Sequence, residues 1–98
     1  MPKYRLSRLA LKDLEAIDKY TEERWGFVQA YRYISDLNRT FAELAEHPHL
    51  GRSFDKLKRR YRRFEQGTHV VLYRVEEGGV FISRILHQRM LPRRHVIE

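Results

Sequence analysis

Basic side chains and one histidine are the residues of this chain whose types could do chemistry on RNA. Cleavage through the 2′-hydroxyl needs a base, a cation beside the developing phosphorane and an acid for the leaving oxygen. The segment DKLKRRYRRF at 55–64 places six basic side chains in ten positions. His87 is the candidate base or acid, because imidazole titrates near neutrality. The candidate cations are Lys56, Lys58, Arg62, Arg63 and Arg84.

Two other interpretations of the basic segment compete with catalysis. In a strand, Arg60, Arg62 and Phe64 share one face, and Tyr61 and Arg63 the other, so the charges cannot all converge on one phosphate. They can solvate an exposed edge strand and discourage edge pairing, or attract a phosphate backbone or an acidic protein. A single histidine at a strand end likewise packs or hydrogen-bonds more often than it catalyses. The residues alone leave these alternatives open.

Metal and cofactor chemistry have little support in the sequence. His47 and His49 flank a proline, but two loop imidazoles without cysteine or a carboxylate cluster rarely hold a metal ion. The chain has no cysteine, which excludes disulfides and thiolate metal sites. We therefore predict no metal site and no cofactor.

Length and charge limit the classes of protein that fit. The chain has 98 residues, enough for one domain with one core. Its formal net charge is +7, and residues 52–98 hold twelve of the 20 Lys/Arg but only five of the 13 Asp/Glu. Such a one-sided charge attracts acidic proteins or phosphate backbones.

No membrane segment or signal peptide is predicted. The longest uninterrupted apolar run, VVLY at 70–73, is too short to span a bilayer, and the N-terminus lacks a signal-peptide hydrophobic region. We expect a cytoplasmic protein.

Hydrophobic periodicity predicts the elements that position these residues. YRLS at 4–7 alternates like a strand, with Ser7 as the cap of a helix over about 8–24 that stops at Gly26. A second amphipathic helix follows up to His47-Pro48, forming an antiparallel hairpin with the first. Strands are predicted at about 59–65, 68–75 and 80–87, with EEGG at 76–79 as a turn. This is an α+β fold in a single domain (1–98), with 92–98 expected to form a flexible tail.

The last two predicted strands are apolar on both faces. Strict alternation puts Val71 and Tyr73 opposite Val70 and Leu72 in one strand. In the next strand it puts Phe81 and Ile85 opposite Val80, Ile82 and Leu86. A helix hairpin covers only one face of a small sheet, so we expect the other face to await a partner. The alternative is that the second helix or the tail wraps further around.

Several segments together resemble a known family. They are YRLS, DLEAI, ERWG at 23–26, HPHLGR at 47–52, YRRF at 61–64, GTHVVLYRV at 67–75 and ISRILHQRM at 82–90. In this order and spacing the chain resembles a ParE-type toxin of the RelE/ParE superfamily. The resemblance implies a strand, a helix hairpin and a three-stranded antiparallel sheet. It also implies a toxin of a type II toxin–antitoxin module that inhibits DNA gyrase and is silenced by a ParD-like antitoxin.

The same superfamily contains RelE-like ribosome-dependent mRNA endonucleases, which use a basic cluster and a tyrosine or histidine in the last strand. This chain keeps the basic cluster but has no tyrosine after Tyr73, so His87 alone supports the nuclease alternative. The set for that alternative is His87, Arg84, Arg63 and Lys58. Because RILHQRM resembles the ParE branch as a whole, we favour a toxin that is not an enzyme.

Two sets of contact residues follow from this interpretation. For an antitoxin with an acidic and apolar C-terminal segment we predict Arg62, Val71, Tyr73, Arg74 and Ile85. For the toxic target we predict the last strand and tail, through Arg84, His87, Arg89 and Met90. Direct binding to nucleic acid is a secondary expectation.

Overall fold

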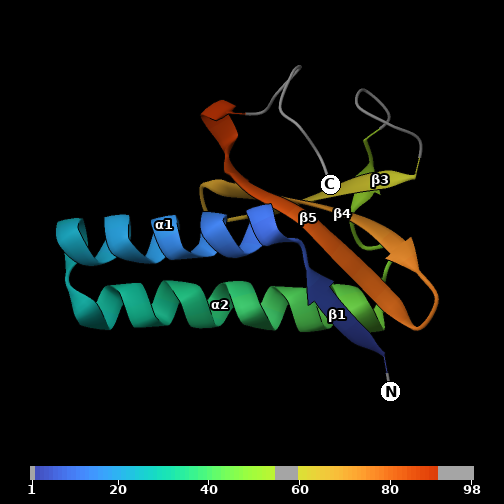
Figure 1. The fold of residues 1–98 in the computed structure, drawn as a ribbon, viewed down its shortest axis with the longest axis horizontal. Coiled ribbons are helices and arrows are strands. Elements are labelled where there is room, and N and C mark those ends of the chain that lie inside the picture. Colours follow the sequence, from blue (N-terminus) through green and yellow to red (C-terminus); the bar gives the residue numbers. More distant parts are fainter. Residues whose placement is uncertain (1, 55–59, 91–98) are drawn as a thin grey trace.

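A computed structural model describes residues 2–54 and 60–90, which form two helices and one five-stranded sheet (Figure 1). The elements are β1 (Lys3–Leu6), α1 (Arg8–Trp25), α2 (Phe27–Glu46), β2 (Arg52–Ser53), β3 (Tyr61–Gln66), β4 (His69–Glu76), β5 (Gly79–His87) and a 3₁₀ turn, η1 (Gln88–Met90). The predicted α+β class and element order are confirmed. The predicted tail at 92–98 lies outside the described residues.

The sheet has five strands where three in one antiparallel sheet were expected, in the order β1-β5-β4-β3-β2. The N-terminal strand β1 joins the sheet by pairing in parallel with β5, and the short β2 pairs with β3. At the start of β5, a side chain on Gly79 would collide with the backbone of Lys3, so glycine permits the close approach of β1.

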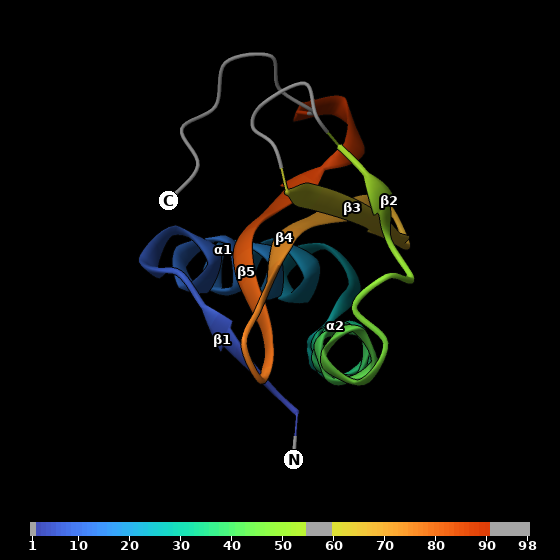
Figure 2. The same ribbon diagram turned by 90° about the vertical axis from the view of Figure 1, so that its right-hand side faces the viewer.

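The helix hairpin begins and turns at the residues that the sequence predicts. The Ser7 hydroxyl accepts a hydrogen bond from the Ala10 amide at 2.9 Å, which caps α1, and donates one to the Ser83 carbonyl at 2.7 Å, which ties the helix start to β5. Gly26 has φ +93°, a conformation that disfavours a side chain, so α1 ends there and α2 starts at the next residue. Figures 1 and 2 show the two helices side by side, with α2 seen nearly end-on in the second view.

The main core lies between the two helices and one face of the sheet. The helices contribute Ala10, Ile17, Leu37, Phe41, Leu44 and Ala45, and the sheet contributes Val71, Tyr73, Val80, Ile82 and Ile85. None of the helices in the described part of the chain is long and apolar enough to cross a membrane.

A β-bulge in β5 overturns the strict alternation that the sequence predicts. Tyr73 pairs with Ile82 but Leu72 pairs with Arg84, so Ser83 is the extra residue. The faces of β5 therefore exchange after Ser83. Ile85 joins Ile82 in the main core, whereas Leu86 lies in a second cluster with Phe54, Val70 and Leu72.

The second face of the sheet is not the bare apolar surface that was expected. All four residues of the second cluster are buried, and so are Tyr61 and Phe81. Arginines cover aromatic rings there: Arg5 and Arg74 lie 4.6 and 4.3 Å from the centre of the Phe81 ring, and Arg63 lies 5.4 Å from that of Phe54. Long arginine side chains can shield apolar area while their charged ends stay near water. The sequence pattern shows where apolar residues lie but not which side chains fold over them.

Candidate functional site

Arg84, predicted to contact a target or phosphate, is instead held in a half-buried ion pair with α1. Its Nε and Nη2 donate to the two carboxylate oxygens of Asp13 at 2.8 and 3.0 Å, and the Ile85 amide donates to the same carboxylate at 2.9 Å. The side chains of Arg84 and Asp13 are only 13% and 15% exposed. A carboxylate inside the molecule therefore already neutralises the charge of Arg84, which leaves little of it for a target or a phosphate.

The other members of the nuclease set are also engaged or outside the described residues. Arg63 donates to Glu65 at 2.7 Å, and Lys56 and Lys58 fall in the undescribed segment. Arg63 and Arg84 both pair in register with Leu72, from opposite sides of β4, yet each is bound to a different carboxylate. The described part of this set offers no unpaired arginine to a phosphorane.

The apolar residues predicted to bind an antitoxin belong to the interior. Val71, Tyr73 and Ile85 are buried beneath the helices in the main core, so they have no surface to offer a partner. They are buried because the helix hairpin covers this face of β4 and β5. Tyr73 also has a structural role, since its hydroxyl donates to the Pro48 carbonyl at 2.6 Å and accepts from the Gly51 amide at 2.9 Å. Burial raises the pKa of Tyr73.

Replacing Tyr73 with phenylalanine is expected to destabilise the fold by about 1–3 kcal/mol, because it leaves the Pro48 carbonyl and the Gly51 amide without their partner. Urea unfolding followed by circular dichroism measures the change. Tyr31→Phe, at an exposed position of α2, is the matched control and should change the free energy of unfolding by less than about 0.5 kcal/mol. Equal stabilities of the two variants would contradict the structural role of the Tyr73 hydroxyl.

The two arginines predicted to meet antitoxin carboxylates are partly exposed but differ in their neighbours. Arg62 donates from Nε to the Gly51 carbonyl at 2.7 Å and so holds the loop before β2. Arg74 stacks on Phe81 and donates to the Tyr61 hydroxyl at 3.3 Å. Arg74 thus lies over the second face of the sheet, whereas Arg62 is tied to the loop before β2.

A pocket of about 630 Å³ brings two of the predicted target residues together with several that sequence reasoning missed. It lies where α1 and α2 meet the start of β4 and the end of β5. We call it the histidine pocket; it is lined by Ala16, Ile17, Tyr20, Thr21, Arg24, Trp25, Gln29, Tyr33, Thr68, His69, His87 and Met90. His87 and Met90 were predicted, whereas Arg89 is exposed and does not line the pocket.

The two histidines of the pocket pack against each other across β4 and β5. His69 and His87 pair in register, with ring centres 5.5 Å apart and planes at 79°. Burial and the neighbouring His87 lower the pKa of His69, so His69 is neutral near pH 7. The sequence carried no signal for this pair, because the bulge at Ser83 sets which residue of β5 lies opposite His69.

Comparison with known proteins identifies the family. Residues 4–92 match the family described as the ParE toxin of the type II toxin–antitoxin system parDE. The chain belongs to the ParE toxin family. It is 47% identical over 96 residues to Toxin ParE1 of Caulobacter vibrioides, covering 98% of this chain and 99% of that protein. It is 39% identical over 89 residues to Toxin ParE1 of Mycobacterium tuberculosis strain H37Rv, covering 90% and 91%.

A solved structure supports the same ParE fold. A chain of the chromosomal ParDE toxin–antitoxin system from P. aeruginosa superposes with a TM-score of 0.74 over 89% of this chain and 96% of that one. The two sequences are 22% identical, so this likeness concerns the fold alone.

The most exposed large apolar side chains in the described part of this ParE-family chain lie on the helix hairpin. Tyr20, Trp25, Phe27, Val28 and Tyr31 are 61–68% exposed, and we call them the hairpin patch. Tyr20 and Trp25 also line the histidine pocket, and the Arg24 guanidinium lies 6.0 Å from the centres of both rings. Exposed apolar groups in such a concentration are typical of a protein interaction site.

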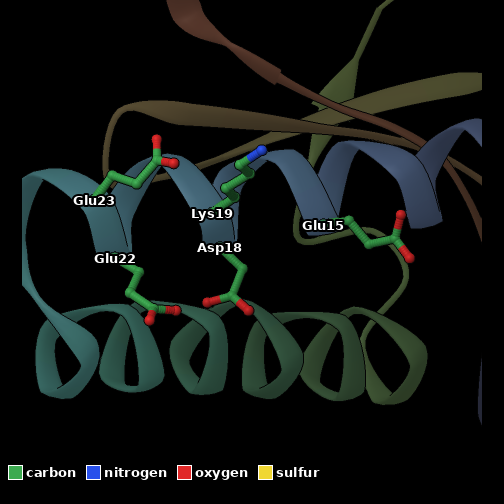
Figure 3. A pocket seen from close by; sticks show the side chains of 5 residues that line it. All are labelled: Glu15, Asp18, Lys19, Glu22 and Glu23. Atoms are coloured by element: carbon green, nitrogen blue, oxygen red, sulfur yellow. The ribbon is translucent and has the colours of Figure 1, made fainter.

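A second hollow, of about 430 Å³, is acidic. It is lined along α1 by Glu15, Asp18, Lys19, Glu22 and Glu23, with Asp18 and Glu22 pointing toward α2 (Figure 3). An acidic or phosphate-bearing partner is repelled by these four carboxylates, so it is directed away from this side of α1.

Proposed function

We propose that this ParE-family chain is a cytoplasmic toxin that inhibits DNA gyrase without being an enzyme, and that a ParD-like antitoxin neutralises it. The observation that carries the proposal is the family match across residues 4–92. The family description includes the toxin–antitoxin system parDE, and ParD-like antitoxins are the partners that the sequence resemblance implies.

The geometry of the basic residues favours this function over mRNA cleavage. An endonuclease needs cations that can approach the phosphorane, yet Arg63 and Arg84 are each bound to a carboxylate. His87, the candidate base or acid of the alternative mechanism, accepts a hydrogen bond at Nδ1 from the Arg89 amide at 3.1 Å, so its neutral ring has no free lone pair with which to act as a base. These contacts suit a protein that binds its target rather than one that cuts it.

The proposed target contact lies at the end of β5 and in η1. His87 is half-buried, Met90 is 46% exposed and Arg89 is exposed, so the three can approach a partner together. Arg84 is excluded from this surface because it is bound to Asp13.

The proposed antitoxin contact is on the helix hairpin, not on the apolar sheet face that the sequence pattern favoured. The apolar part of the antitoxin segment covers the hairpin patch and reaches the histidine pocket, where apolar area is exposed. Its acidic residues meet Arg74 and the accessible part of Arg62. Direct binding to nucleic acid is secondary to these two protein contacts.

Parallel assays on the purified chain test the proposal. We expect the chain to abolish supercoiling by gyrase, and to leave mRNA uncut when added to translating ribosomes. Addition of a ParD-like antitoxin should restore supercoiling at a stoichiometric ratio. Codon-phased mRNA cuts with normal supercoiling would instead establish the nuclease alternative.

A further inference from the structure

The hydrogen bonds of the histidine pocket determine which nitrogen of His69 carries a proton. The Tyr33 hydroxyl lies 3.1 Å from the Gln66 carbonyl oxygen and 2.6 Å from His69 Nδ1. A carbonyl oxygen only accepts, so both bonds form together when Tyr33 donates to Gln66 and His69 Nδ1–H donates to Tyr33. Neutral His69 then has a bare lone pair on Nε2, to which no described residue donates.

His87 has the opposite arrangement. Its Nδ1 accepts from the Arg89 amide at 3.1 Å, so in the neutral ring the proton is on Nε2. The pocket therefore contains one imidazole Nε2–H donor, from His87, and one imidazole Nε2 acceptor, from His69. A carboxylate, which only accepts, fits the first and is repelled by the second.

We propose that the histidine pocket binds a carboxylate carried by the apolar segment of the antitoxin, and that His69 takes up one proton from solvent at Nε2 as the complex forms. This inference rests on the proposed function. The carboxylate then accepts from His87 Nε2–H and from the new His69 Nε2–H, and the positive charge on His69 is paired with the entering negative charge. No covalent bond forms or breaks.

His69 accepts this proton at lower structural cost than His87. Protonation of His69 at Nε2 preserves its Nδ1–H bond to Tyr33, whereas protonation of His87 at Nδ1 breaks the bond from the Arg89 amide. Half-burial and His87 keep His69 neutral while the pocket is empty.

The groups around His69 agree with an anionic ligand. From α1, the Asp13 carboxylate raises the pKa of His69, but it is already engaged by Arg84. From α2, Tyr33 holds Nδ1, and from β5, His87 faces the ring. Arg24 on α1 adds positive charge to the lining, and Tyr20, Trp25 and Met90 supply apolar walls. An acidic side chain flanked by apolar ones matches this lining.

The affinity of the antitoxin as a function of pH tests the inference. Uptake of one proton strengthens binding by up to about tenfold for each pH unit of decrease. The affinity begins to rise as pH falls through the pKa of His69 in the complex. It stops rising once pH is below the pKa of His69 in the free toxin. Calorimetry with the intact chain and the purified antitoxin in buffers of different ionisation enthalpy should give an uptake approaching one proton.

Variants separate His69 from the other titrating groups. His69→Gln should lower the number of protons taken up on antitoxin binding by one and make the affinity nearly independent of pH. His49→Gln, in the loop before β2, should leave both quantities unchanged. Glutamine keeps a side-chain donor for Tyr33, and circular dichroism checks the fold. NMR of the wild-type imidazoles provides a second measurement, with His69 expected to carry one proton in the free toxin and two in the complex near pH 7.

The outcomes distinguish this inference from the proposed function. Tight binding of the antitoxin with the same pH dependence in wild type and His69→Gln, and a singly protonated His69 in the complex, would overturn the inference alone. Absence of antitoxin binding at every pH would overturn both.

Discussion

Replacing Asp13 with alanine is expected to lower the free energy of unfolding by about 3–5 kcal/mol, the largest effect on stability that we predict. The Asp13 carboxylate accepts two hydrogen bonds from Arg84 and one from the Ile85 amide. Its removal takes the compensating carboxylate away from a half-buried guanidinium and from a backbone donor. A domain of this size is stable by about 5–15 kcal/mol, so the loss is a large fraction of the total.

Urea unfolding of Asp13→Ala beside Glu15→Ala isolates this contact. Both variants replace a carboxylate of α1 with the best helix former, but Glu15 is exposed, so its loss should change stability by less than about 0.5 kcal/mol. Asp13→Leu combined with Arg84→Met should recover much of the stability, since an apolar pair leaves no unpaired charge. If Asp13→Ala were as stable as Glu15→Ala, the ion pair would not be what fixes α1 to β5.

This ion pair also shows where sequence reasoning succeeded and where it failed. Local signals, such as the Ser7 cap, the Gly26 stop and the apolar stripes, depend on neighbours along the chain, and the structure confirms the elements that they predict. Asp13 and Arg84 are 71 residues apart, and no local pattern states that they meet. A basic residue therefore looked available for a target when it was already paired.

The candidate site depends on a single irregularity that periodicity cannot show. With a regular hairpin, His69 would lie opposite Leu86; the bulge at Ser83 shifts the register by one and places His87 there instead. The same shift moves Ile85 into the main core. One inserted residue thus explains both the missed histidine pair and the burial of Ile85 in the main core.

The position of the histidine pocket suggests how neutralisation and toxicity are connected. His87 and Met90 belong both to the pocket proposed for the antitoxin and to the surface proposed for the target. An antitoxin segment seated there covers two of the three target residues. Arg89 precedes Met90 in η1 but does not line the pocket, so the two contacts can be separated at this residue.

Reversing the charge of Arg89 is therefore expected to abolish growth arrest while leaving antitoxin binding largely intact. Arg89→Glu should raise the concentration that inhibits gyrase supercoiling by about 30- to 1,000-fold, as loss of about 2–4 kcal/mol at an interface would. Its backbone amide still donates to His87, so the histidine pocket keeps its shape. Titration of the variant with antitoxin should change affinity by less than about threefold, because Arg89 lies outside the pocket.

Arg32→Glu controls for the change in net charge, since Arg32 is an exposed arginine on α2 and its substitution makes the same change. This control should remain toxic and inhibit supercoiling at the wild-type concentration. Equal loss of gyrase inhibition and antitoxin binding in Arg89→Glu would show that the two partners share Arg89. Loss of gyrase inhibition in both Arg89→Glu and Arg32→Glu would show that toxicity depends on the overall charge. Because a long-range charge effect weakens with salt and a direct contact at Arg89 weakens less, repeating the supercoiling assay at two ionic strengths distinguishes these causes.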